Sequence, residues 1–173
     1  IARAGAIEPL VALVRSGGVG GKERAAAALG NLALNDDNKM AIARAGAIEP
    51  LVALLHNGSA WEQEAAAATL GNLAARNAAN TLAIVRAGAI EPLVALVASG
   101  SAGAQEVATD ALRNLATDNA ANTKAIVRAG AVEPFVLPVR SGSDSAQARA
   151  AQALTHLADN APHRETIAQA GAI

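Results

Sequence analysis

AGAIEPLVAL at residues 4–13 is the stretch that decides the fold, because the chain repeats it at an almost constant interval. The same ten letters return at 45–54 and 87–96, and the variant AGAVEPFVLP stands at 129–138. A period of this length indicates supersecondary units that stack and bury their apolar faces against one another. We therefore expect one domain over 1–173, built from four repeats at about 4–44, 45–86, 87–128 and 129–169.

Each repeat carries three helical signals. The phrase itself predicts a helix of about two to three turns, with Pro9 at its first position and Gly17 where it ends. An alanine-rich segment such as 62–74 predicts a longer second helix. A third, short helix is expected to start at an N-capping asparagine, with Asn38, Asn80 and Asn122 as the candidates. No stretch alternates with the period of a strand, so we expect no β-sheet.

The repeat resembles the armadillo repeat. The resemblance rests on the pattern N-x-x-x-I-x-x-A-G-A-I-x-P-L-V-x-L, and on a long helix ending in L-x-N-L-A, over essentially the whole chain. It implies an all-α, right-handed superhelical solenoid of about four armadillo repeats with three helices each. In that family the long helices, which the family's numbering counts as the third of each repeat, line a concave groove that holds an extended peptide or a partner protein. The expected function is a non-enzymatic protein-interaction scaffold.

The resemblance also suggests which residues contact a ligand. In peptide-binding members an asparagine late in the third helix pairs with the peptide backbone, and an amide offers both the donor and the acceptor that this needs. The matching positions here are Asn31, Asn72 and Asn114, with His156 in the fourth repeat. The alternative is that these asparagines only stabilise the repeat itself.

Charge and aromatic residues refine the expected ligand. Glu64, Glu106 and Asp110 form a mildly acidic strip that favours a basic or backbone-dominated ligand, or else they are a solvated helix face. Members of the nuclear-import type carry a tryptophan four residues before the asparagine. Ala27, Ala68, Asp110 and Gln152 stand there instead. An import-receptor function is therefore disfavoured, and Trp61 is expected to pack locally.

Composition excludes several other classes of function. The net charge of −1 gives no basic field for a nucleic acid or an anionic membrane. The absence of cysteine excludes disulfides and thiolate sites and favours an intracellular chain, in the cytoplasm or nucleus. His56, His156 and His163 lack ligand partners at metal-site spacing, so no metal or cofactor is expected. GGVGGKE at 17–23 fails the phosphate-loop pattern and is expected to be a flexible loop.

Two further expectations concern the ends and the fourth repeat. The chain reads as a segment of a longer array, excised or engineered, whose apolar ends associate head to tail. This self-association is the alternative to peptide binding. Pro138 stands where the other copies have leucine, five residues into the helix, and predicts a kinked or shortened helix.

Overall fold

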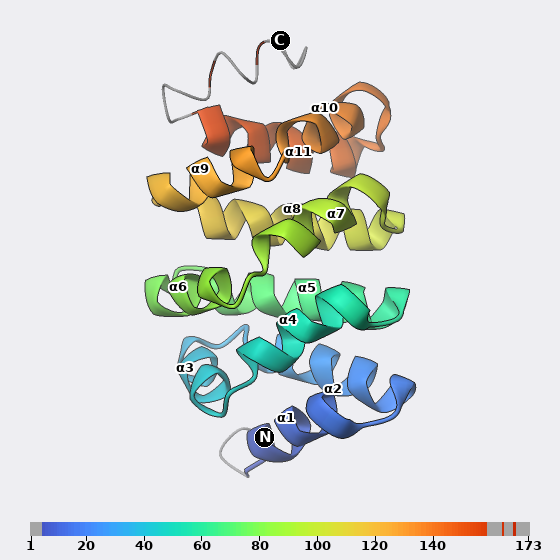
Figure 1. Cartoon of the computed structure of the whole chain (residues 1–173), viewed down its shortest axis with the longest axis vertical. Coiled ribbons are helices and arrows are strands. Elements are labelled where there is room, and N and C mark those ends of the chain that lie inside the picture. The colour runs from blue at the N-terminus through green and yellow to red at the C-terminus, as the bar shows by residue number, and fades with distance from the viewer. Residues whose placement is uncertain (1–4, 159–163, 165–167, 169–173) are drawn as a thin grey trace. The chain divides into compact units, whose positions relative to one another are not determined.

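The computed structural model describes residues 5–158, 164 and 168 of the 173-residue chain. Within these residues every regular element is an α-helix, which confirms the all-α prediction (Figure 1). No single described helix is long and apolar enough to cross a membrane. The helices are α1 (Ile7–Ser16), α2 (Val19–Leu32), α3 (Asp36–Arg44), α4 (Ile48–Asn57), α5 (Ala60–Ala74), α6 (Ala78–Arg86), α7 (Ile90–Ser99), α8 (Ala102–Ala116), α9 (Ala120–Arg128), α10 (Val132–Ser141) and α11 (Asp144–Ala158).

These helices form two compact units, and each is described by itself. The first unit, Ile1–Ala89, contains α1 to α6, and the second, Ile90–Ile173, contains α7 to α11. Both follow the predicted order of a ten-residue helix, a longer helix of 14 or 15 residues and a short helix of nine. That the whole chain acts as one domain stays a prediction.

The first helix of a repeat begins two residues before its proline, so the predicted position of proline is wrong. α1 starts at Ile7, and Pro9 is its third residue. Leu10 donates its backbone N–H to the carbonyl oxygen of Ala6, at 3.2 Å. A residue one position earlier has no acceptor inside the helix, so proline loses no hydrogen bond there. The prediction for the glycine is confirmed, because Gly17 caps the end of α1.

The short helices begin three residues earlier than predicted. Asn35, Asn77 and Asn119 are the N-caps, and each side chain accepts a hydrogen bond from the backbone three residues on. The predicted cap Asn80 is buried instead, and its side chain donates to the carbonyl oxygen of Leu73 at 3.1 Å. Asn38 and Asn122 bond in the same way to Leu32 and Leu115. These amides therefore join each short helix to the end of the long helix before it.

Two expectations about chain breaks are also corrected. GGVGGKE is not a loop, because α2 already starts at Val19 and only Gly17 and Gly18 separate it from α1. Packing of the rest of this helix outweighs the low helix propensity of Gly20 and Gly21. α10 keeps ten residues, the length of α1, α4 and α7, so the predicted shortening at Pro138 is wrong. The predicted kink stays a prediction.

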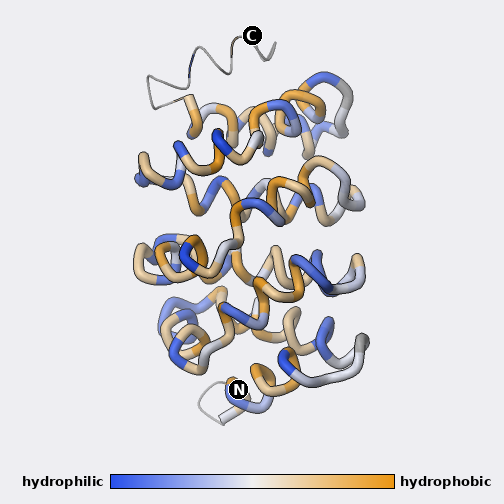
Figure 2. Tube along the Cα trace, in the orientation of Figure 1, coloured by the Kyte–Doolittle hydropathy of each residue, from blue (hydrophilic) through white to orange (hydrophobic). Residues whose placement is uncertain are grey.

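Aliphatic side chains build the core of each unit, with the aromatic ring of Phe135 added in the second. Leu29, Leu51 and Leu70 are fully buried in the first unit, and Leu112 and Leu157 in the second. Figure 2 shows that the helices carry both hydrophobic and hydrophilic positions, as helices with one buried face must. Alanines on the long helices let neighbouring helices approach closely, and this brings the residues of the candidate site together.

Candidate functional site

In the first unit the candidate asparagines lie on two long helices in direct contact, α2 and α5. The hydroxyl group of Thr69 in α5 lies 2.8 Å from the carbonyl oxygen of Ala26 in α2. Gly30 permits this approach, because a Cβ atom there would stand 2.7 Å from the Thr69 hydroxyl oxygen. The small residue thus sets the spacing between the two helices.

Asn72 has a structural contact that fixes one side of its amide. Its Nδ2 donates to the carbonyl oxygen of Gly30 at 3.1 Å, which links α5 to the last turn of α2. The amide oxygen is thereby oriented away from that bond, since the two ends of an amide point in different directions. Asn31 is exposed and its side chain makes no hydrogen bond within the described residues. Asn72 therefore fits both the structural and the ligand-binding interpretation of the sequence. Its Nδ2 bonds within the fold, and its Oδ1 is available to accept a hydrogen bond from a ligand.

In the second unit the equivalent positions are Asn114 on α8 and His156 on α11. Both side chains are half-buried, and Asn114 already has an interaction within the structure. His156 lies in the last turn of α11. Their predicted role in ligand binding stays a prediction.

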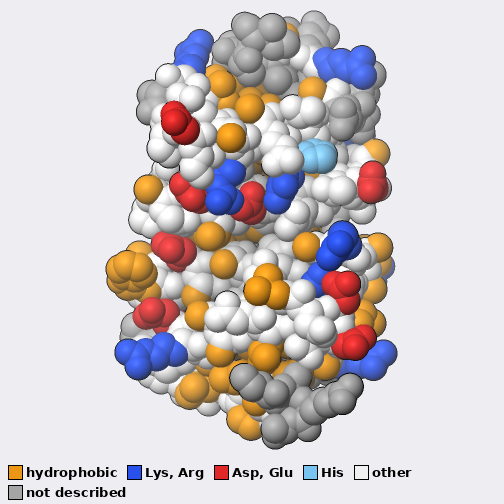
Figure 3. All heavy atoms as spheres, turned by 180° about the vertical axis from the view of Figure 1, so that it is seen from behind, with side chains coloured by type: hydrophobic (Ala, Val, Ile, Leu, Met, Phe, Trp, Pro, Cys, Tyr) orange, Lys and Arg blue, Asp and Glu red, His pale blue; other side chains and the backbone are white. Residues whose placement is uncertain are grey.

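The predicted acidic residues of α8 are paired with arginines. Arg149 of α11 contacts both Asp110 and Glu106, the latter at 3.6 Å between Nε and Oε2. Arg113 lies 3.4 Å from Asp110 and donates to the side chain of Gln152 at 3.1 Å. Figure 3 shows such positive and negative side chains next to one another on the surface. Glu106 and Asp110 therefore present a charge-balanced patch, which we call the α8–α11 ion cluster.

The remaining predicted acidic residue and the tryptophan lie on α5. Glu64 is half-buried and has an interaction of its own. Trp61 is 67% exposed, so the prediction that it packs locally is wrong. It is the second residue of α5, where the helix has just begun and few neighbouring side chains reach it.

Sequence reasoning missed a buried polar contact in the first unit. The Lys39 side chain is buried, and its Nζ lies 2.7 Å from Asp36 Oδ1 and 2.8 Å from the carbonyl oxygen of Ala75. The hydrogen bond and the positive charge of Lys39 lower the pKa of Asp36 below the ordinary carboxyl value. Thr81 and Thr123 occupy the equivalent positions in the next two repeats. The departure of a lysine from a run of threonines was the available signal.

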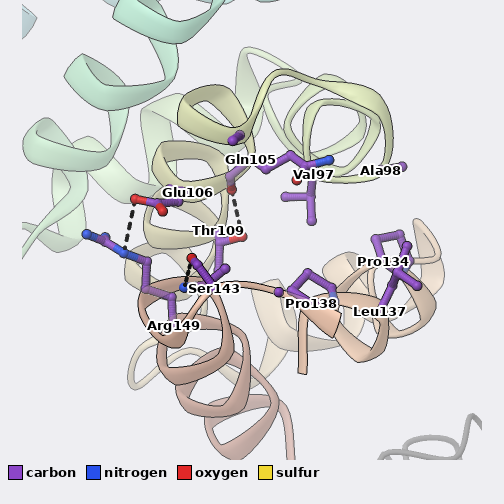
Figure 4. A pocket seen from close by; sticks show the side chains of 13 residues that line it. Val97, Ala98, Gln105, Glu106, Thr109, Pro134, Leu137, Pro138, Ser143 and Arg149 are labelled. Carbon is purple, nitrogen blue, oxygen red and sulfur yellow. Dashed lines mark hydrogen bonds and ion pairs between the residues drawn. The ribbon is translucent and has the colours of Figure 1, made fainter. Parts of the chain in front are cut away.

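Each unit also has a pocket at the turns that join its first and second helices. The second-unit pocket, of about 310 Å³, lies between the α7–α8 and α10–α11 turns. Figure 4 shows Val97 and Ala98 facing Pro134, Leu137 and Pro138 across it. The first-unit pocket, of about 660 Å³, lies between the α1–α2 and α4–α5 turns. No sequence pattern indicated either pocket.

The expected head-to-tail contacts involve the first helix, at residues 4–14, and the last segment, at residues 162–173, most of which lies outside the described residues. His163 lies outside them as well. Head-to-tail association therefore stays a prediction.

Comparisons with known proteins agree with the helical repeat scaffold defined by this fold. The armadillo/beta-catenin-like repeat matches residues 1–34, 35–75 and 77–117. The chain belongs to the armadillo repeat family. Two of the matched segments begin at Asn35 and Asn77, which are the N-caps of the short helices α3 and α6. The family's repeat therefore starts with the short helix. No curated protein sequence matches the chain.

Several solved structures are similar to the chain over most of its length. The designed armadillo repeat protein YIII(Dq)4CqI shares 31% identity at a TM-score of 0.91, over 98% of this chain and 72% of its own. The designed armadillo repeat protein YIII(Dq.V1)4CPAF, in complex with the peptide (KR)4, shares 30% sequence identity at a TM-score of 0.90. The match covers 98% of this chain and 72% of that protein. An engineered protein shares 36% sequence identity at a TM-score of 0.92, over 100% of this chain and 43% of its own.

Proposed function

We propose that this chain is a scaffold that binds an extended peptide, or an extended segment of a partner protein, along its long helices. The observation that carries the proposal is the pair Asn31 and Asn72 on the contacting helices α2 and α5. The similar designed protein with the peptide (KR)4 supports the ligand class. Peptide binding needs no catalytic group, and the proposal includes none.

The amides recognise the peptide backbone rather than its side chains. The Gly30 contact restricts the rotation of the Asn72 side chain, so less rotamer entropy is lost when a ligand binds. Ala27 and Ala68, one turn before the two asparagines, leave space for bulky ligand side chains beside them. Asn114 extends the same pattern in the second unit, where the α8–α11 ion cluster balances its own charge. We therefore expect modest selectivity for charge and strong dependence on backbone hydrogen bonds.

The test is a binding screen against extended peptides with the parent chain and with the triple variant Asn31→Ala, Asn72→Ala, Asn114→Ala. Each lost hydrogen bond contributes about 0.5–1.5 kcal/mol, so the triple variant should bind selected peptides about tenfold to two-thousandfold more weakly. Fluorescence anisotropy measures the affinities, and circular dichroism checks that both chains are equally helical.

Two controls separate backbone recognition from other effects. Asn57→Ala removes an exposed asparagine at the end of α4 and should leave affinity unchanged. Peptides with N-methylated amides should bind the parent chain poorly, because they lack backbone donors. Equal affinity of the parent and the triple variant for every selected peptide would show that the asparagines do not hold the ligand.

A further inference from the structure

The pockets of the two units occupy equivalent places in the repeat but have different chemistry. Both lie between the turn of one helical hairpin and the turn of the next. In the second unit the positions of Arg15, Lys22 and Glu62 are taken by Ala98, Gln105 and Ala146. Only the first-unit pocket therefore has charged groups at these three positions. The second-unit pocket carries its charges elsewhere, at Glu106 and Arg149, and these two side chains pair with each other. The charges of the first-unit pocket therefore need a local explanation.

Glu62 is the unusual residue of the first-unit pocket. Its side chain lines the pocket but is only 4% exposed. Oε2 accepts a hydrogen bond from the backbone N–H of Ser59 at 2.8 Å, whereas buried Oε1 has no partner within the described residues. A buried polar atom without a hydrogen bond typically costs about 1–3 kcal/mol, and more when it is charged. A donor group that reached Oε1 would remove this cost.

The helix cap does not account for this oxygen. Ser59 and Glu62 form a capping box, in which each side chain bonds to the backbone of the other residue. That arrangement uses Oε2 alone. α8 begins at a serine cap without any glutamate, because Ser101 accepts from Ala104. A capped helix in this repeat therefore does not require a carboxylate at this position.

The neighbouring cationic side chains do not donate a hydrogen bond to Glu62 Oε1 either. Lys22 lines the pocket and forms no ion pair within the described residues. Arg15 directs its guanidinium to the carbonyl oxygen of Gly46, at 2.9 Å. Val14, Pro50 and Leu54 supply an apolar wall against which an alkyl chain can lie.

We propose that the first-unit pocket binds an alkylguanidinium or alkylammonium group, with Glu62 Oε1 as its acceptor. The alkyl part packs against the apolar wall, and the long side chain of Lys22 moves aside as the cation enters. This site uses neither Asn31 nor Asn72, so it is independent of the peptide-binding proposal. Its ligand chemistry is shared by arginine or lysine side chains and by free diamines.

The experiment titrates the whole chain with N-acetyl-arginine N-methylamide and follows the backbone amides of Gly58 to Glu62 by NMR. N-acetyl-citrulline N-methylamide is the neutral control of nearly the same shape. We expect saturable shifts with the arginine compound and none with the citrulline compound. Agmatine, a free molecule with the same guanidinium group, is titrated in parallel and distinguishes the sources. Tighter binding than the blocked arginine favours a free small-molecule cation, and weaker binding favours a peptide side chain.

Three variants test the role of each charge. Glu62→Gln keeps a side chain able to complete the capping box and should weaken binding at least tenfold. Glu49→Gln, at an exposed lining residue, is the matched control and should change affinity less than twofold. Lys22→Met removes the repelling charge and should tighten binding severalfold. Melting curves confirm that each variant is folded.

Several results would overturn the proposal. Equal shifts with citrulline, or unchanged affinity in Glu62→Gln, would show that no cation is held by this carboxylate. Weaker binding in Lys22→Met would show that Lys22 holds the ligand. If Lys22→Met lowers the melting temperature of the parent but not of Glu62→Gln, and no compound binds, the carboxylate is paired with Lys22 in solution and the pocket is not a site.

Discussion

The α2–α5 contact and the α8–α11 contact join equivalent helices of two repeats by different means. In the first unit, Gly30 has no side chain and so leaves room for Thr69, and Asn72 donates a hydrogen bond to the backbone of α2. In the second unit, Arg113 stands at the place of Gly30, and α11 is held by Arg149. The first contact depends on shape and on hydrogen bonds to backbone, while the second depends on charge.

The helices therefore repeat more strictly than the contacts between them. Short-range hydrogen bonds and close packing are insensitive to salt, whereas half-exposed ion pairs are screened by it. A ligand lying on α2 and α5 meets a rigid amide, and a ligand lying on α8 and α11 competes with arginines for their carboxylates. The two faces should therefore respond differently to mutation, to salt and to pH.

The largest effect is expected from Gly30→Val, which forces the two helices of the first contact apart. The new side chain collides with the Thr69 hydroxyl group, and overpacking of this kind typically costs about 1–3 kcal/mol of unfolding free energy. Urea unfolding followed by circular dichroism measures the loss.

Two further variants establish the cause of that loss. Gly20→Ala adds a methyl group where no atom lies within 4 Å and should be neutral or stabilising by up to about 1 kcal/mol. The double variant Gly30→Val, Thr69→Ala should recover part of the loss. If Gly30→Val is as stable as the parent, the close approach does not hold α2 and α5 together.

A smaller effect is expected from Arg149→Met in the α8–α11 ion cluster. Arg149 is 38% exposed and contacts two carboxylates, so its loss should cost about 0.5–1 kcal/mol at low salt. The difference from the parent should shrink towards zero near 1 M NaCl, where the screening length falls to about 3 Å. Melting curves at several salt concentrations measure this.

Lys124→Met is the matched control for that experiment, since Lys124 is exposed and forms no ion pair within the described residues. It should show little change at any salt concentration. A cost for Arg149→Met that persists unchanged at high salt would mean that the alkyl part of the arginine, and not its charge, joins the helices.

Much of the fold could be predicted because its signals are local. Proline and glycine delimit each first helix, and alanine content marks each long helix, so the repeat was visible without any structure. The short helices show the limit. Asn77 and Asn80 stand three residues apart and both suit an N-cap, and only the contact of Asn80 with Leu73 decides between them.

The candidate site was predictable in position but not in state. The pattern located Asn72, yet its bond to Gly30 depends on how closely α2 and α5 approach. The same holds for Glu106 and Asp110, whose partner Arg149 lies about one repeat further along the chain. Whether Glu62 Oε1 lacks a hydrogen-bond partner among the described residues depends on how the helices bury it, and no local sequence pattern determines that.

The smallest effect is expected from pH, at the ion pair of Asp36 and Lys39 in the first unit. The Lys39 hydrogen bond and charge lower the pKa of Asp36, so the folded state favours the ionised carboxylate. The resulting stabilisation is complete above the unfolded pKa of about 3.9 and is lost as the pH falls through the lower folded value.

Asp36→Asn should therefore be less stable than the parent at neutral pH and equal to it in acid. Thr123→Val, at the uncharged position that corresponds to Lys39, should show a difference from the parent that does not vary between these pH values, as urea unfolding at each pH would reveal. A constant difference for Asp36→Asn as well would mean that the attraction between Asp36 and Lys39 within α3 does not stabilise the first unit. Ionic stabilisation would then apply to the α8–α11 ion cluster alone.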